Sequence, residues 1–160
     1  MLVVARLLAD GPLVLTAVLL GLMVAFPRLS MRASASRAII AAIVALDVAG
    51  LIGVAWDRPR PFIANIGQAW ISHAATSSFP SNHLTLQWTD AGMLLLDRRT
   101  RPLGIVIALL GLPMAWARVY LGVHYPSDMM GALGIAGLIT VSGWGVMHFI
   151  EHRRARLLNG

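Results

Sequence analysis

The chain has 160 residues, of which 58% are hydrophobic and 12% are charged, and its formal net charge is +6. Soluble domains carry about 25% charged residues, so this composition excludes an ordinary soluble protein and, more firmly, a disordered one. There is no cysteine, which excludes disulfides, thiolate metal sites and cysteine nucleophiles. All 13 basic residues are arginines placed between long apolar runs, a pattern typical of membrane topology and not of nucleic-acid binding.

Five apolar stretches predict an all-α integral-membrane bundle that forms a single domain over residues 1–160. We expect transmembrane helices at about 12–26, 38–56, 84–96, 103–120 and 129–150. A crossing helix needs about 20 apolar residues, and the stretch 84–96 is shorter, so a buried core helix is the alternative there. The first stretch is expected to stay uncleaved, because Pro27 and Arg28 follow it in place of the small residues of a signal-peptide cleavage site.

The arginines divide unequally between the two sides of such a bundle. Nine fall on one side, at 28–37, 98–101 and 153–156, and four fall on the other, at 6, 58, 60 and 118. The positive-inside rule places the arginine-rich side in the cytoplasm. The C-terminus is then cytoplasmic, and the loops at 57–82 and 121–127 face outward. The same division favours a crossing at 84–96, since without it the arginines at 98–101 would lie outside.

A first group of reactive side chains lies on the expected outer side, directly after the stretch 38–56. It contains Arg58 and Arg60, each followed by a proline. Prolines fix φ and stiffen the chain, so a guanidinium here can be held in place for bidentate phosphate binding. The alternative is that these arginines extend along the membrane surface or bind lipid headgroups.

A second group, Ser81, Asn82 and His83, opens the stretch 84–96. Ser81 or Asn82 can cap this helix, and the free N–H groups at its start, together with the helix dipole, form an anion site. His83 lies in the first turn, where it can donate a proton to a ligand. The alternative is a simple helix cap followed by a histidine at the membrane interface.

A third group consists of Arg118, His124 and Asp128. Pro126 suits the first position of the last helix, which places Asp128 in its first turn and His124 just before it. A carboxylate bonded to one imidazole nitrogen fixes the tautomer and leaves the other nitrogen free to attack. Arg118 ends the preceding helix, near enough to share an anion with His124. A structural ion network is the alternative.

Together the three groups suit phosphoryl transfer through a phosphohistidine. His124 attacks phosphorus, Asp128 orients it, and His83 protonates the leaving oxygen and later activates water. The arginines and helix amides stabilise the phosphoryl oxygens. No metal or other cofactor is required: two histidines and an aspartate can bind zinc, but arginines so close by would repel a cation.

The spacing of these residues resembles the three motifs of the type 2 phosphatidic acid phosphatase superfamily, K-x6-R-P, P-S-G-H and S-R-x5-H-x3-D. The third motif is matched from Ala117 to Asp128, the second by residues 80–83, and the first only by Arg60 and Pro61. The stretches 60–67, 78–83 and 118–128 are also similar to bacterial undecaprenyl-diphosphate phosphatases of the bacitracin-resistance type. The resemblance covers residues 10–150.

The resemblance implies a multi-pass lipid phosphatase of the bacterial plasma membrane, with its active site facing outward. Such an enzyme hydrolyses undecaprenyl diphosphate to undecaprenyl phosphate and recycles this carrier lipid for the synthesis of peptidoglycan and other envelope polymers. It needs no metal, and its partners are the lipid diphosphate substrate and membrane lipids, with no nucleic acid. The resemblance assigns His124 as nucleophile, Asp128 as its partner and His83 as general acid.

The resemblance also assigns the phosphate-binding residues, which are Arg60, Arg118, Ser81 and the amide of Asn82. The chain departs from the family motifs at three positions. The lysine position is Gly53, the serine of the third motif is Ala117, and the glycine of the second motif is Asn82. Arg58 is a candidate replacement for the lysine. The departures remove binding groups and leave both histidines and Asp128, so we expect an active enzyme.

Two alternative functions stay open. The same site can act on another lipid phosphate, such as phosphatidate, phosphatidylglycerophosphate or lipid A, or pass its phosphoryl group to another lipid. A non-catalytic membrane protein that binds lipid diphosphate is the second alternative, and the missing lysine supports it.

Two acids inside the apolar stretches are candidates for function, because an ionisable group at that depth is costly. Asp90 shares a helix face with His83 and Gln87 and can line a polar cavity beneath the site. The alternative is a hydrogen-bonded interhelical pair or a protonated carboxyl, which we favour for Asp47.

Overall fold

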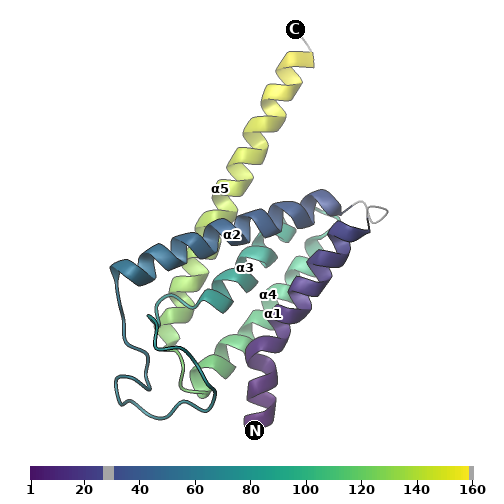
Figure 1. Ribbon diagram of the computed structural model, residues 1–160. Coiled ribbons are helices and arrows are strands. Elements are labelled where there is room, and N and C mark those ends of the chain that lie inside the picture. The colour runs from purple at the N-terminus through teal and green to yellow at the C-terminus, as the bar shows by residue number, and fades with distance from the viewer. Residues whose placement is uncertain (27–30, 159–160) are drawn as a thin grey trace.

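The computed structural model describes residues 1–26 and 31–158 of the chain. These residues form five helices, α1 (Leu2–Ala25), α2 (Arg32–Ala55), α3 (Asn82–Leu95), α4 (Arg101–Tyr120) and α5 (Pro126–Leu158), and contain no strand (Figure 1). The expected all-α fold is confirmed. Four of the helices are long and apolar enough to cross a membrane, whereas the 14 residues of α3 are too few to do so alone.

Helix α1 begins at Leu2, well before the start expected at Pro12. A proline inside a helix removes one backbone hydrogen bond, and neighbouring contacts can compensate for this loss. Upstream of the proline, Ala5 and Ala9 are fully buried against α4. This packing keeps the first turns helical and brings them beside the end of α4.

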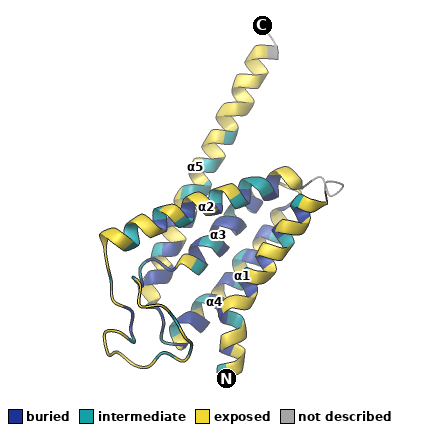
Figure 2. Ribbon diagram, in the orientation of Figure 1, coloured by how far each residue is buried: buried dark blue, intermediate teal, exposed yellow. Residues whose placement is uncertain are grey.

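Helix α3 lies at the centre of the bundle and is the most buried of the five helices (Figure 2). Several of its buried residues are polar, and Gln87 is an example of one whose hydrogen-bonding groups find partners on neighbouring helices. The Gln87 amide donates to the carbonyl of Ile107 on α4 at 3.1 Å and accepts from the Thr16 hydroxyl of α1 at 3.2 Å. Asp90 is also buried, but its Oδ1 has no hydrogen-bond partner. Asp47, in contrast, is exposed on α2.

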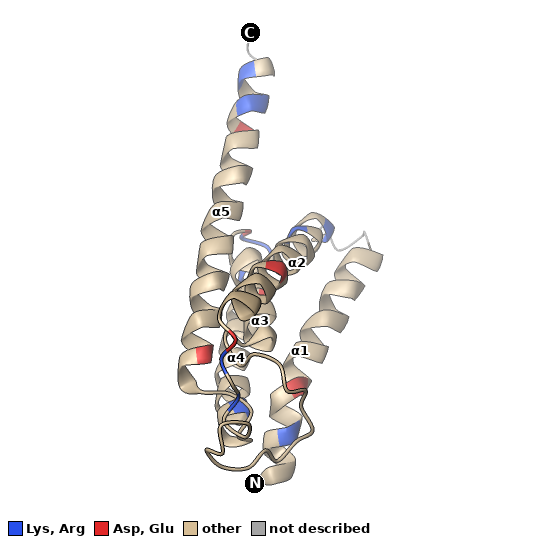
Figure 3. Ribbon diagram, turned by 60° about the vertical axis from the view of Figure 1, so that its left-hand side comes forward, with Lys and Arg blue, Asp and Glu red and all other residues tan. Residues whose placement is uncertain are grey.

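Although α3 is short, the residues just before and just after it contact opposite ends of the bundle. Asp97, just after α3, accepts a hydrogen bond from Ser34 at 2.5 Å and lies 3.9 Å from Arg37, near the start of α2. The arginines at 32, 37 and 98–101 therefore share one end, as expected, while Arg28 lies outside the described residues. Charged residues gather toward the ends of the helices, and α5 projects far beyond its neighbours (Figure 3).

Candidate active site

The two loops at the other end of the bundle are joined by Arg60. Its Nη1 donates to the Val123 carbonyl of the α4–α5 loop at 2.9 Å. Its Nε and Nη2 donate to the carbonyls of Thr76 and Ser77, both at 3.0 Å, within its own α2–α3 loop. All three nitrogens of the Arg60 guanidinium thus donate hydrogen bonds within the protein, and the residue is 5% exposed. Its position fixes the loop that carries His124.

The imidazole of His124 is held at both nitrogens. Its Nδ1 lies 3.1 Å from Asp128 Oδ2 and 2.9 Å from the Ser78 carbonyl oxygen. Two acceptors at Nδ1 assign the proton to that nitrogen, which leaves a lone pair on Nε2. Nε2 faces Arg60 Nη1 at 3.1 Å. The arrangement provides a nucleophilic nitrogen with its partner carboxylate on the opposite edge of the ring.

Burial affects the protonation of this histidine. Burial lowers the pKa of His124, and Asp128 acts in the opposite direction by hydrogen bonding and charge. A lowered pKa keeps the ring neutral at pH values near its ordinary titration range. The neutral form is the one that has a free lone pair, so the environment favours the nucleophilic state.

Arg58 forms an ion pair with the carboxylate of Asp128. Its Nη1 lies 3.0 Å from Asp128 Oδ1 and 2.6 Å from the Ser127 hydroxyl, and its guanidinium lies 4.1 Å from the ring centroid of Tyr125. The backbone N–H of Tyr125 donates to Asp128 Oδ2 at 2.9 Å. Asp128 is fully buried, so these donors offset the cost of its charge. Sequence reasoning made Arg58 a candidate for phosphate binding. In the structure its guanidinium contacts the Asp128 carboxylate instead.

The pocket beside His124 contains Arg118 and His83 together with a residue that the sequence did not indicate, Asp10. Asp10 Oδ1 lies 2.6 Å from Arg118 Nη2 and 3.2 Å from His83 Nε2. Arg118 is 1% exposed, its Nε donates to the Ala9 carbonyl at 3.2 Å, and its Nη1 has no partner. The pocket has a volume of about 270 Å³ and is lined by Asp10, Ile71, Ser72, His73, Ala74, His83 and Arg118.

The start of α3 has a buried hydroxyl without a hydrogen-bond partner, that of Ser81. Ser81 is the N-cap residue, but its side chain makes no capping hydrogen bond, and its buried hydroxyl has no partner. The expected side-chain cap at Ser81 is therefore absent. The backbone N–H of Ser81 donates to the Asp128 carbonyl at 3.2 Å, which ties the start of α3 to α5. The side chain of Asn82 is exposed and lines a different hollow, together with Gly53.

A further residue close to His124 is His73, which lies in the loop expected to face outward and for which the sequence predicts no catalytic role. The ring of His73 packs edge-on against His124, with 6.0 Å between the ring centroids, and lines the same pocket as Arg118. Neither His73 nor Asp10 belongs to a recognisable motif. The sequence does place an acid, Asp10, next to a predicted transmembrane stretch. This position points to the site only once α1 is known to begin before Pro12, because Asp10 then lies within the helix.

The contacts of Arg60 predict a loss of stability on substitution. Arg60→Lys keeps the charge but cannot reproduce the bonds to both loops, and we expect the free energy of unfolding to fall by about 2–4 kcal/mol. The thermal unfolding midpoint in detergent measures this effect. Arg98→Lys, at an exposed arginine of the opposite end, is the matched control. Equal midpoints for Arg60→Lys and the wild type would contradict the role of Arg60 in joining the loops.

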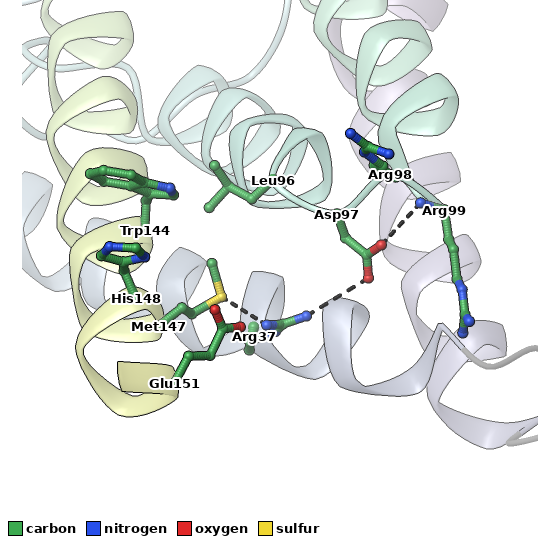
Figure 4. A pocket seen from close by; sticks show the side chains of 9 residues that line it. All are labelled: Arg37, Leu96, Asp97, Arg98, Arg99, Trp144, Met147, His148 and Glu151. Carbon is green, nitrogen blue, oxygen red and sulfur yellow. Dashed lines mark hydrogen bonds and ion pairs between the residues drawn. The ribbon is translucent and has the colours of Figure 1, made fainter. Parts of the chain in front are cut away.

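A pocket at the opposite end has a different chemistry. Arg37 lies there between Asp97 and Met147, 2.7 Å from the Met147 sulfur, and Trp144 stacks on His148 with 5.5 Å between the rings (Figure 4). His148 and His152 contact each other at 2.9 Å. These histidines lie far from Asp128 along α5 and do not join the site around His124.

The sequence pattern described as "PAP2 superfamily" matches residues 34–153. The chain belongs to the PAP2 superfamily. The matched region includes His83, Arg118, His124 and Asp128 but not Asp10. The resemblance seen in the sequence is therefore confirmed at the level of the family.

Individual relatives cover part of the chain. "Putative undecaprenyl-diphosphatase YbjG" of Escherichia coli (strain K12) is 44% identical over 100 residues, which are 62% of this chain and 50% of the relative. "Undecaprenyl-diphosphatase BcrC" of Bacillus subtilis (strain 168) is 36% identical over 100 residues, 62% of this chain and 51% of the relative.

A mycobacterial relative has a different named substrate. "Decaprenylphosphoryl-5-phosphoribose phosphatase" of Mycobacterium tuberculosis (strain ATCC 25618 / H37Rv) is 50% identical over 60 residues, which are 37% of this chain and 30% of the relative. The chain thus spans about half the length, or less, of the relatives it matches. No solved structure matches the chain.

Proposed function

We propose that this protein is an integral-membrane lipid phosphatase that hydrolyses undecaprenyl diphosphate to undecaprenyl phosphate and inorganic phosphate through a phosphohistidine. The observation that carries the proposal is the orientation of His124, whose Nδ1 is fixed by Asp128 while Nε2 keeps its lone pair. The membership of the PAP2 superfamily and the two relatives named undecaprenyl-diphosphatases support the substrate class. In a cell, the product would re-enter envelope synthesis as a carrier lipid.

The first chemical step uses three side chains. His124 Nε2 attacks the terminal phosphorus, an N–P bond forms, and the bond from phosphorus to the bridging oxygen breaks. His83 gives its proton to that oxygen, which leaves on undecaprenyl phosphate. Arg118 Nη1, buried and without a partner, is placed to bind the phosphoryl oxygens and stabilise the charge that develops on them.

The second step returns the enzyme to its starting state. His83, now neutral, takes a proton from water, the hydroxide oxygen attacks phosphorus, and the N–P bond breaks to release inorganic phosphate. We propose that no metal takes part, because the guanidinium groups of Arg60 and Arg118 supply the positive charge that a metal would otherwise provide. Ser81, with its unpaired hydroxyl, and the Asn82 amide are proposed as further phosphate donors.

A second candidate function keeps the site and changes the lipid. The mycobacterial relative, whose name describes a phosphatase of a different polyprenyl phosphate, favours this alternative. The pocket of Arg118 and His83 is proposed to bind the phosphate group that both lipids carry, so the same residues would serve either substrate. The experiment below separates them.

A substrate panel tests the proposed function. The purified protein in detergent, with EDTA present, is expected to release phosphate from undecaprenyl diphosphate faster than from phosphatidate, phosphatidylglycerophosphate or a decaprenyl phosphate sugar. Faster release from one of the other lipids would assign a different substrate. Loss of release on adding EDTA would exclude the metal-free mechanism, and no release from any lipid would exclude the phosphatase itself.

We also propose that the site faces outward from the bacterial plasma membrane and that the C-terminus is cytoplasmic. The arginines at 32–37, 98–101 and 153–156 support this orientation through the positive-inside rule. The chain has no cysteine, so a single cysteine introduced at Gln68 reports on one side alone. Labelling of Gln68→Cys from the cytoplasmic side only would reverse the proposed orientation.

A further inference from the structure

We propose that Asp10 of α1 is a positioning residue of the active site, which holds the phosphate-binding arginine Arg118 and the general acid His83 through one shared carboxylate oxygen. The proposal rests on the proposed function, because it assigns these two residues their roles. Asp10 lies outside the region matched by the family pattern. It comes from a helix that contributes no other polar side chain to the pocket.

The contact with Arg118 determines which of its nitrogens is free. Asp10 Oδ1 accepts a hydrogen bond from Arg118 Nη2 at 2.6 Å, and the neighbouring Ala9 carbonyl accepts one from Arg118 Nε at 3.2 Å. Both partners belong to α1 and lie on one side of the guanidinium. A buried arginine held in this way retains a fixed plane, and only Nη1 is left without a partner. Asp10 thereby directs one N–H edge of Arg118 toward a ligand.

The contact with His83 determines which of its nitrogens can act as the acid. An ionised carboxylate accepts only, so the 3.2 Å contact places a proton on Nε2. The proton given to the leaving oxygen then comes from Nδ1, after the ring has gained its second proton. Asp10 stabilises that doubly protonated ring. The site therefore has two histidine–carboxylate pairs, one at His124 with Asp128 and one at His83 with Asp10.

The other charged neighbours of His83 act against its protonation. Burial, together with the charges of Arg118 of α4, His124 of the α4–α5 loop and His73 of the α2–α3 loop, lowers the pKa of His83 to about 4, although Asp10 acts in the opposite direction. Among the described residues, Asp10 is the group around His83 that favours the protonated acid. A substrate phosphate beside the ring would act in the same direction.

Asp10→Asn tests the proposal, because it removes the charge while keeping an oxygen that Arg118 can bind. In a histidine-detected NMR titration, with the His83 signal assigned by its loss in His83→Gln, we expect His83 to lose its proton at lower pH in Asp10→Asn than in the wild type. We expect Asp10→Glu to restore part of the difference. We also expect kcat/KM of Asp10→Asn to fall by about 10- to 100-fold, with the basic limb of its pH profile at lower pH.

Asp47→Asn is the matched control, since Asp47 is also an acid on an apolar helix but is exposed and makes no ion pair within residues 1–26 and 31–158. It should change neither the titration nor kcat/KM. An unchanged His83 titration in Asp10→Asn would overturn the proposal. If the wild type releases no phosphate from any lipid, the proposed function fails, and the titration still decides whether Asp10 positions His83.

Discussion

Replacing His124 with alanine is expected to reduce phosphate release by at least about 10⁴-fold, because removal of a nucleophile abolishes the covalent route and leaves only binding and electrostatic stabilisation. His124 Nε2 carries the lone pair in the described geometry, and no second imidazole has a buried carboxylate at its other nitrogen. Release of radiolabelled terminal phosphate from undecaprenyl diphosphate measures the effect. Rapid mixing should also show that the variant forms no acid-labile phosphoprotein.

His148→Ala serves as the control for this substitution. His148 lies at the opposite end of the bundle, where it contacts Trp144 and His152, so its loss should leave turnover unchanged. A wild-type rate for His124→Ala would mean that another residue attacks phosphorus. In that event His73, whose ring centroid is 6.0 Å from that of His124, would be the next residue to test.

Asp128→Asn is expected to slow formation of the phosphohistidine by about 10²- to 10⁴-fold. The amide of asparagine can donate to Nδ1, which would shift the proton to Nε2 and remove the nucleophilic lone pair. The loss should be smaller than for His124→Ala, because the Ser78 carbonyl, at 2.9 Å from Nδ1, remains as a second acceptor that favours the original tautomer. Single-turnover kinetics with labelled substrate measures this step alone.

Glu151→Gln is a matched control for Asp128→Asn, since Glu151 is an exposed acid elsewhere on α5. The asparagine oxygen can then face Arg58, which is partly exposed, so the loss of the ion pair is expected to have little effect on folding. A melting midpoint like that of the wild type would confirm this. Unchanged single-turnover kinetics in a folded Asp128→Asn would show that Asp128 does not orient the nucleophile.

The sequence was sufficient to predict the contact between His124 and Asp128, because Pro126 marks the start of the last helix and the side chains on either side of this short turn can meet. It did not predict the partners of Arg60, which cross between two loops and depend on how those loops pack. Motif reasoning assigned Arg60 to phosphate, and the structure shows three bonds to carbonyl groups. Local patterns contain no information about such long-range partners.

The boundary of α1 had the largest consequence for the site. The first apolar run was counted from Pro12, and this made residue 12 the expected start. Burial of Ala5 and Ala9 against α4 extends the helix to Leu2 instead. That extension is what places Asp10 next to Arg118 and His83, so an error of one helix boundary concealed an active-site neighbour.

The partly polar interior of α3 has a consequence for how the protein enters the membrane. An aspartate at the centre of a crossing segment costs about 2.5–3.5 kcal/mol when the segment partitions alone into lipid. The 14 residues of α3 include Asp90 as well as Gln87 and Thr89, all buried, and offer few apolar residues to offset that cost. We therefore expect α3 to partition poorly into lipid as an isolated segment and to depend for its insertion on the helices that pack around it. The helix whose first turn contains His83 is thus the one whose entry into the membrane depends most on its neighbours.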